Sequence, residues 1–119
     1  MTILALTCSL HYLAIPLILN KHYVYTATIF LATTLGIIWH TFDILMELDY
    51  IMAGLWFMQD IYWSFILTQY DIILLNLIVL ILNLMTNFTN NYVLYHSIWH
   101  VISAIKCIYI AFKIKYYFI

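Results

Sequence analysis

The stretch YHSIWH, residues 95–100, places two histidines four residues apart at the start of a long apolar run. On an α-helix, residues at this spacing lie one turn apart on the same face, so both imidazoles can bind one metal ion. Ionisable side chains within lipid-facing sequence are costly and usually have a function. A second polar cluster lies upstream, from Trp39-His40 to Asp49-Tyr50. We expect the two clusters to meet in the folded protein.

The composition of the rest of the chain indicates an integral membrane protein. Of 119 residues, 67% are hydrophobic and 8% are charged. A soluble domain of this size needs many more charges to cover its surface. The net charge is −1 and there is no basic tract, so nucleic acid is not expected as a partner.

Five apolar runs separated by short polar breaks predict an all-α, polytopic membrane protein. We expect transmembrane helices at about 3–20, 23–41, 50–68, 71–86 and 92–113. The first run lacks the basic segment and cleavage site of a signal peptide, so it is interpreted as a retained helix. The five runs occupy nearly the whole chain. Residues 1–119 are therefore expected to form one helical-bundle domain, with no soluble domain.

The lysines predict the orientation of the bundle. Lys21 follows the first span, whereas Lys113 and Lys115 follow the fifth, and five spans place these positions on the same side. The positive-inside rule assigns this side to the cytoplasm, together with the C-terminus, and puts the N-terminus outside. Both polar clusters then lie at the outer face. We expect a multi-pass protein of a secretory-pathway or cell-surface membrane, and a glycosylation sequon at Asn87 falls on the outer side.

The residues of the two clusters suit zinc chemistry. Three histidines, His40, His96 and His100, would leave a fourth zinc position for water. Zinc lowers the pKa of bound water toward about 7, and a carboxylate such as Asp49 can orient that water or take its proton. A centre of this kind that opens into lipid suits hydrolysis of an amide or ester bond in a membrane lipid. Asp49 has an alternative interpretation as the N-cap of the third helix.

These motifs resemble the CREST superfamily of transmembrane hydrolases, which includes the alkaline ceramidases and the progestin and adiponectin receptors. The segment from Trp39-His40 to Asp49-Tyr50 is similar to the GPI-remodelling members, and residues 96–101 are similar to the myomaker group. The resemblance covers residues 36 to 101. It implies that His40, His96 and His100 bind zinc and that Asp49 contacts the metal-bound water.

The chain departs from the family pattern in two ways. The family has a serine four residues before its first histidine, and that position is Gly36 here. The family also has seven spans, whereas this chain has five predicted spans. Loss of an even number of helices keeps the predicted site on one face. A homo- or hetero-oligomer could supply further helices.

Two other functions fit the sequence. The first is a non-catalytic remodelling or interaction protein with a structural zinc site. The second is a small haem protein, in which His40 would have to lie opposite His96 across the porphyrin. An open coordination position favours the enzyme, and a Soret band would identify the haem protein.

Two charged residues lie deep inside predicted spans. Asp60 in the third span and Lys106 in the fifth lie at similar depth, where an isolated charge is costly. We expect them to pair or to share a polar cavity. The alternative is a protonated Asp60 and a Lys106 that extends toward the interface. His11 and His22 match no motif, and Cys8 and Cys107 are interpreted as small buried apolar residues.

Overall fold

The chain folds as an all-α bundle in the computed structural model, which describes residues 2–117. The helical elements are α1 (Ile3–Ser9), η1 (Leu10–Ala14), α2 (Ile15–Ile18), α3 (Tyr23–Phe42), α4 (Met46–Ile66), α5 (Asp71–Thr86) and α6 (Tyr92–Tyr117). The first three follow one another without a break and form one rod, so the described part of the chain contains five helical rods. This confirms the all-α class and the five helices predicted from the apolar runs.

The first rod is not a regular α-helix along its length. Its middle segment, η1, is a 3₁₀ helix. Pro16 has no N–H to give to the carbonyl of Tyr12, and that carbonyl instead accepts from the N–H of Ile15. The helix predicted at about 3–20 is therefore a 3₁₀ helix over residues 10–14.

The connection between α3 and α4 is shorter than predicted. Asp43 has a left-handed backbone (φ 56°) and ends α3 by donating its N–H to the Trp39 carbonyl at 2.7 Å. Helix α4 then begins at Met46 rather than at Tyr50. Asp49 lies inside its first turn and donates its own N–H to the Leu45 carbonyl at 3.0 Å. The N-cap of α4 is Leu45, so the interpretation of Asp49 as the N-cap is wrong.

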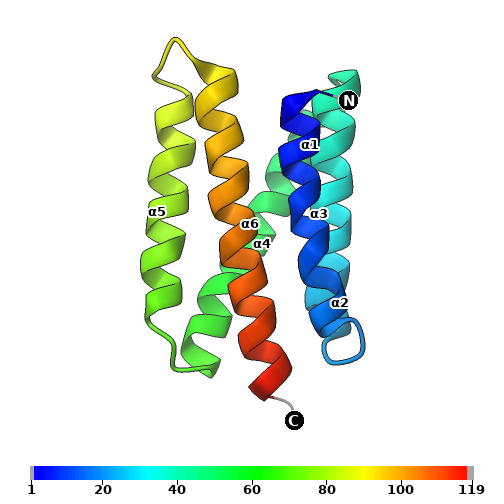
Figure 1. The fold of residues 1–119 in the computed structure, drawn as a ribbon, viewed down its shortest axis with the longest axis vertical. Coiled ribbons are helices and arrows are strands. Elements are labelled where there is room, and N and C mark those ends of the chain that lie inside the picture. Colours follow the sequence, from blue (N-terminus) through cyan, green and yellow to red (C-terminus); the bar gives the residue numbers. More distant parts are fainter. Residues whose placement is uncertain (1, 118–119) are drawn as a thin grey trace.

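The rods pack as two antiparallel pairs with α4 crossing between them (Figure 1). One pair is α5 with α6, and the other is the α1–α2 rod with α3. Helix α6 also contacts the α1–α2 rod, and α4 contacts both α3 and α5. The N-terminal end of the chain, the α3–α4 turn and the α5–α6 loop lie at one end of the bundle, opposite the C-terminus (Figure 1). This arrangement brings the two polar clusters of the sequence to the same end.

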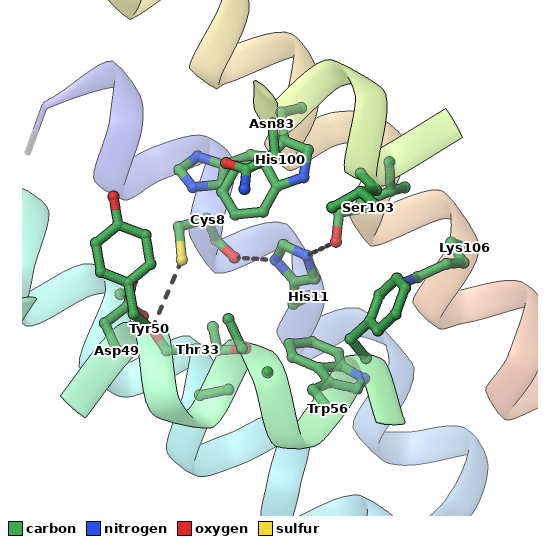
Figure 2. Close-up of a pocket in the computed structure, with 18 residues that line it drawn as sticks. Cys8, His11, Thr33, Asp49, Tyr50, Trp56, Asn83, His100, Ser103 and Lys106 are labelled. Carbon is green, nitrogen blue, oxygen red and sulfur yellow. Dashed lines mark hydrogen bonds between the residues drawn. The ribbon is translucent and has the colours of Figure 1, made fainter. Parts of the chain in front are cut away.

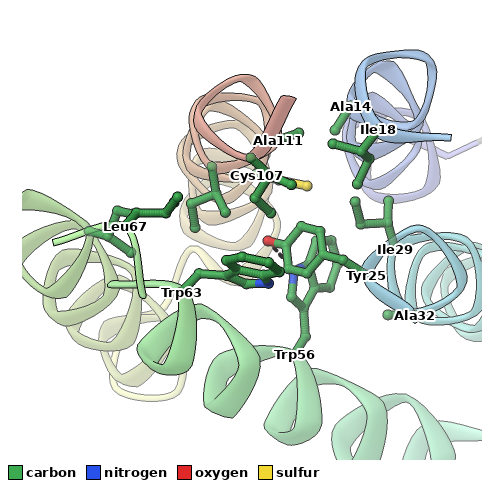
Figure 3. Close-up of a cluster of buried hydrophobic side chains, with 13 residues drawn as sticks. Ala14, Ile18, Tyr25, Ile29, Ala32, Trp56, Trp63, Leu67, Cys107 and Ala111 are labelled. Carbon is green, nitrogen blue, oxygen red and sulfur yellow. Dashed lines mark hydrogen bonds between the residues drawn. The ribbon is translucent and has the colours of Figure 1, made fainter. Parts of the chain in front are cut away.

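The apolar core fills the space between α4 and the two pairs (Figure 3). Trp56 and Trp63 of α4 point toward Tyr25 of α3, and Cys107 of α6 lies on the far side of that tyrosine. Ala14 and Ile18 of the first rod also belong to this core. Its other members are Ile29, Ala32, Leu67, Ile72, Ile110, Ala111 and Ile114. These contacts hold α6 and α3 in the positions that define the site described below.

Side chains on the outside of the bundle are largely apolar, and much of the interior is polar. Phe30, Leu55, Leu74 and Ile105 are all more than half exposed. The buried polar side chains are His11, Thr26, Thr28, Thr33, Asp60, Ser64, Asn76, Thr86, His96, His100 and Lys106. Two helices, α3 and α6, are long and apolar enough to cross a membrane, and the helical stretch 3–18 and α5 are apolar but shorter.

Candidate metal centre

Three histidines from two helices converge at one end of the bundle. His40 lies in the last turn of α3, and His96 and His100 lie in the first turns of α6. The His40 ring centroid is 5.0 Å from that of His96 and 5.0 Å from that of His100, and the latter two are 4.5 Å apart. One nitrogen of each ring lies within 4.8 Å of those of the other two. His96 and His100 are buried, His40 is partly buried, and the cluster can hold a metal ion.

His96 is the member of the cluster whose ring nitrogens have no partners among the described residues. Its side chain is 2% exposed, and neither Nδ1 nor Nε2 has a hydrogen-bond partner among the described residues. A buried polar group without a partner is costly, and nearly all such groups in native proteins are paired. A metal ion would satisfy the nitrogen of this ring that binds it.

The hydrogen bonds of His100 define which of its nitrogens faces the cluster. Nδ1 lies 3.0 Å from Thr7 Oγ1, and the Thr7 hydroxyl donates its own proton to the Ile3 carbonyl at 2.9 Å. Thr7 must therefore accept from His100, so Nδ1 carries the proton and Nε2 keeps its lone pair. A hydrogen bond to the non-ligating nitrogen is the usual support of a metal-binding histidine.

Aromatic rings enclose the three histidines. Trp39 stacks on His40 with centroids 4.5 Å apart, and Tyr92 stacks on His96 at 4.9 Å. Trp99 lies between the two α6 histidines, at 4.8 Å from His96 and 5.2 Å from His100. These rings pack around the imidazoles and support their orientation.

A cavity of about 330 Å³ adjoins the cluster at His100 (Figure 2). Its polar lining includes Cys8, His11, Asp49, Asn83, Ser103 and Lys106. His40 and His96 do not line it. His100 is thus the member of the cluster that faces both the other histidines and the cavity.

Asp49 lies on the cavity wall in front of Gly36. A Cβ atom built at Gly36 would lie 3.3 Å from Asp49 Oδ1 and 2.7 Å from Cys8 Sγ. The missing side chain of Gly36 is therefore what lets the Cys8 thiol approach α3, next to the carboxylate. Asp49 directly precedes the apolar run that starts at Tyr50. Burial raises the pKa of the Asp49 carboxyl to about 6.

Asp60 and Lys106, the two charged residues deep inside apolar runs of the sequence, meet beside the cavity that Lys106 lines. Lys106 Nζ lies 2.8 Å from Asp60 Oδ2 and donates to Asn76 Oδ1 at 2.8 Å. Asp60 Oδ1 accepts from the Tyr25 hydroxyl at 2.5 Å, and that hydroxyl accepts from Trp56 Nε1 at 3.1 Å. The structure therefore joins the charged pair to a network that crosses four helices.

Sequence reasoning missed the contribution of the first rod. Thr7, Cys8 and His11 all reach the site, and none was assigned a role. His11 offered the one available signal, since a histidine within an apolar run is costly unless it has a partner. Its partners, the Cys8 carbonyl and Ser103, become evident only from the packing of the rod against α6.

Comparisons with known proteins leave this geometry as the main basis for interpretation. No protein-family model matches the chain, and no curated protein or solved structure matches it. The buried three-histidine cluster and the cavity beside it are the features of the structure that bear on function.

Proposed function

We propose that this protein is an integral membrane zinc protein that hydrolyses an amide or ester bond in a membrane lipid. His40, His96 and His100 would bind the zinc ion. The observation that carries the proposal is their convergence around His96, a buried ring whose two nitrogens lack partners within the described part of the chain. In this proposal the bundle spans the membrane with its histidine end outside and its C-terminus in the cytoplasm.

The donor set fits zinc in number and kind. Ligand nitrogens in a tetrahedral site lie about 3.3 Å apart, given zinc–nitrogen bonds of about 2.05 Å. The nitrogens here lie within 4.8 Å of one another, so small rotations of the rings would close the site. Three neutral imidazoles leave one position for water, whose pKa the metal lowers toward about 7.

Asp49 and the cavity supply the other parts of a hydrolytic site. The Asp49 carboxylate lines the same cavity as His100 and can orient a water molecule or take its proton. The apolar residues Ala53, Phe57, Val79 and Leu80 also line the cavity and suit a hydrocarbon chain. This combination is what the resemblance to the CREST hydrolases implies, with a serine replaced by Gly36.

The geometry favours this function over the two alternatives. A structural zinc site would need a fourth side chain to close it, whereas His100 borders an open cavity. A bis-histidine haem would need a porphyrin between His40 and His96. Those rings meet edge to face with centroids 5.0 Å apart, which leaves no slot for a porphyrin.

Metal analysis of the purified protein tests the proposal. We expect about one zinc per chain in the wild type and its loss in His96→Ala and His100→Ala. His22→Asn is the matched control, because His22 caps α3 outside the cluster and asparagine can also cap a helix. Zinc content that is absent from the wild type, or unchanged in both cluster variants, would refute the site.

Activity is tested separately from metal binding. Asp49→Asn should retain zinc but lose about 100-fold or more of the chelator-sensitive hydrolysis of lipid amides or esters, because the amide cannot take a proton. An unchanged rate in this variant would exclude the role proposed for Asp49.

A further inference from the structure

A serine and a histidine form a second polar pair on the cavity wall, about one turn further into the bundle than His100 (Figure 2). His11 Nε2 lies 3.1 Å from Ser103 Oγ, and His11 Nδ1 lies 2.7 Å from the Cys8 carbonyl oxygen. A carbonyl oxygen only accepts, so Nδ1 carries the ring proton. Nε2 therefore holds a lone pair, and the Ser103 hydroxyl donates to it.

We propose that Ser103 and His11 are a nucleophile and its general base, and that they accept an acyl group from a lipid ester or amide bound in the cavity. The hydroxyl, the imidazole and the orienting carbonyl are arranged in the order that activates a serine. Both side chains line the cavity. Trp56 packs edge to face against the His11 ring at 5.1 Å and holds its orientation.

The chemistry of this pair balances without a further oxidant or reductant. Ser103 Oγ attacks the acyl carbon while its proton passes to His11 Nε2, and the tetrahedral intermediate expels the alcohol or amine, which takes that proton. Water then attacks the acyl-serine ester, gives one proton to His11 Nε2, and releases the fatty acid. The same proton returns to Ser103 Oγ as the ester bond breaks.

Lys106 is placed to stabilise the negative charge that develops on the acyl oxygen. It follows Ser103 by three residues on α6 and lines the same cavity. Its ammonium group has three N–H donors, and the structure assigns partners to two of them, Asp60 and Asn76. In this proposal the third donates to that oxygen, and the ammonium group contributes a charge that is already in place when the reaction begins.

The cavity also has an apolar lining that suits an acyl chain. Phe57 of α4 and Val79 and Leu80 of α5 contribute to it. The substrate class is therefore a lipid with a hydrocarbon chain attached through an ester or amide.

This activity does not require the metal, so its test can be separated from that of the zinc site. The full-length protein in detergent is treated with an alkyl fluorophosphonate, a probe that phosphonylates activated serines and releases fluoride. Peptide mapping by mass spectrometry should find the adduct on Ser103, in metal-free and in zinc-loaded protein alike. Absence of an adduct from the wild type, or an adduct only on other residues, would overturn the proposal.

Variants establish the role of each partner. Ser103→Ala should abolish the adduct, and His11→Gln should slow labelling about 100-fold or more, because glutamine cannot take the proton. Ser64→Ala is the matched control, since Ser64 is a buried serine that bonds the Ile61 carbonyl and does not line the cavity. Labelling of folded His11→Gln at the wild-type rate would show that the hydrogen bond is only structural. Should His11→Gln fail to fold, the mapped adduct on the wild type still decides.

Discussion

Replacement of Gly36 by alanine tests how closely the first rod packs against α3. The new methyl group would lie 2.7 Å from Cys8 Sγ, closer than real Cβ contacts allow. We expect Gly36→Ala to destabilise the protein, and we expect the double variant Gly36→Ala/Cys8→Ala to recover the loss. The reason is that removal of Sγ frees the space that the new methyl group needs.

Two opposing effects set the size of this change. Alanine is better than glycine in a helix interior by about 1 kcal/mol, which favours the variant. Overpacking of a buried site costs about 1–3 kcal/mol. The single variant should therefore lose roughly 0–2 kcal/mol of unfolding free energy, and the double-mutant cycle should give a coupling of about 1–3 kcal/mol between the two positions.

The coupling is measured from denaturant unfolding of the four proteins of the cycle in one detergent. Cys107→Ala serves as a control, because Cys107 is a buried cysteine of the core that does not line the cavity. It should show no coupling to Gly36→Ala. Additive effects of Gly36→Ala and Cys8→Ala would refute the close contact between α1 and α3, and with it the placement of the first rod against the site.

Two further predictions concern the network and the support of the histidines. Lys106→Met alone should lower the free energy of unfolding by about 3–5 kcal/mol, because it leaves Asp60 buried without its partner. Asp60→Asn should offset most of that loss in the double variant. Denaturant unfolding measures both effects, and failure of the second change to compensate would exclude the pair. Thr7→Val should weaken zinc affinity about 10–100-fold, because it removes the acceptor of the His100 Nδ1–H bond, and competition with a chelator measures this. Thr28→Val is the control for the second variant, since Thr28 bonds the Val24 carbonyl away from the cluster, and equal affinities of the two variants would contradict the role of Thr7.

The arrangement of the histidines was predictable because it depends on helix periodicity and on the order of the helices. His96 and His100 share a face through their spacing of four residues. His40 comes to the same end because two helices, α4 and α5, lie between the end of α3 and the start of α6. One helix carries the chain away from that end and the other brings it back. These are properties of the chain that do not depend on side-chain packing.

The residues of the first rod could not be predicted in the same way. An apolar run indicates a helix but does not define which of its faces meets which neighbour. Thr7 and Cys8 acquire roles only because the rod lies between α3 and α6. The predicted start of α4 at residue 50 is wrong for a related reason. Asp43 ends α3 and Leu45 precedes α4, both with a left-handed backbone, so the two helices are joined by three residues and not by a long polar loop.

Two polar groups of the cavity come from the first rod. Cys8, in the last turn of α1, and His11, in the 3₁₀ segment, are three residues apart and share a face of the rod. Both face the cavity, the thiol toward Gly36 and the imidazole toward Ser103. Pro16 favours the 3₁₀ turn that holds His11, because it cannot donate to the Tyr12 carbonyl. The proline that interrupts the first helix is therefore connected, through the direction of His11, to the pair that we propose as nucleophile and base.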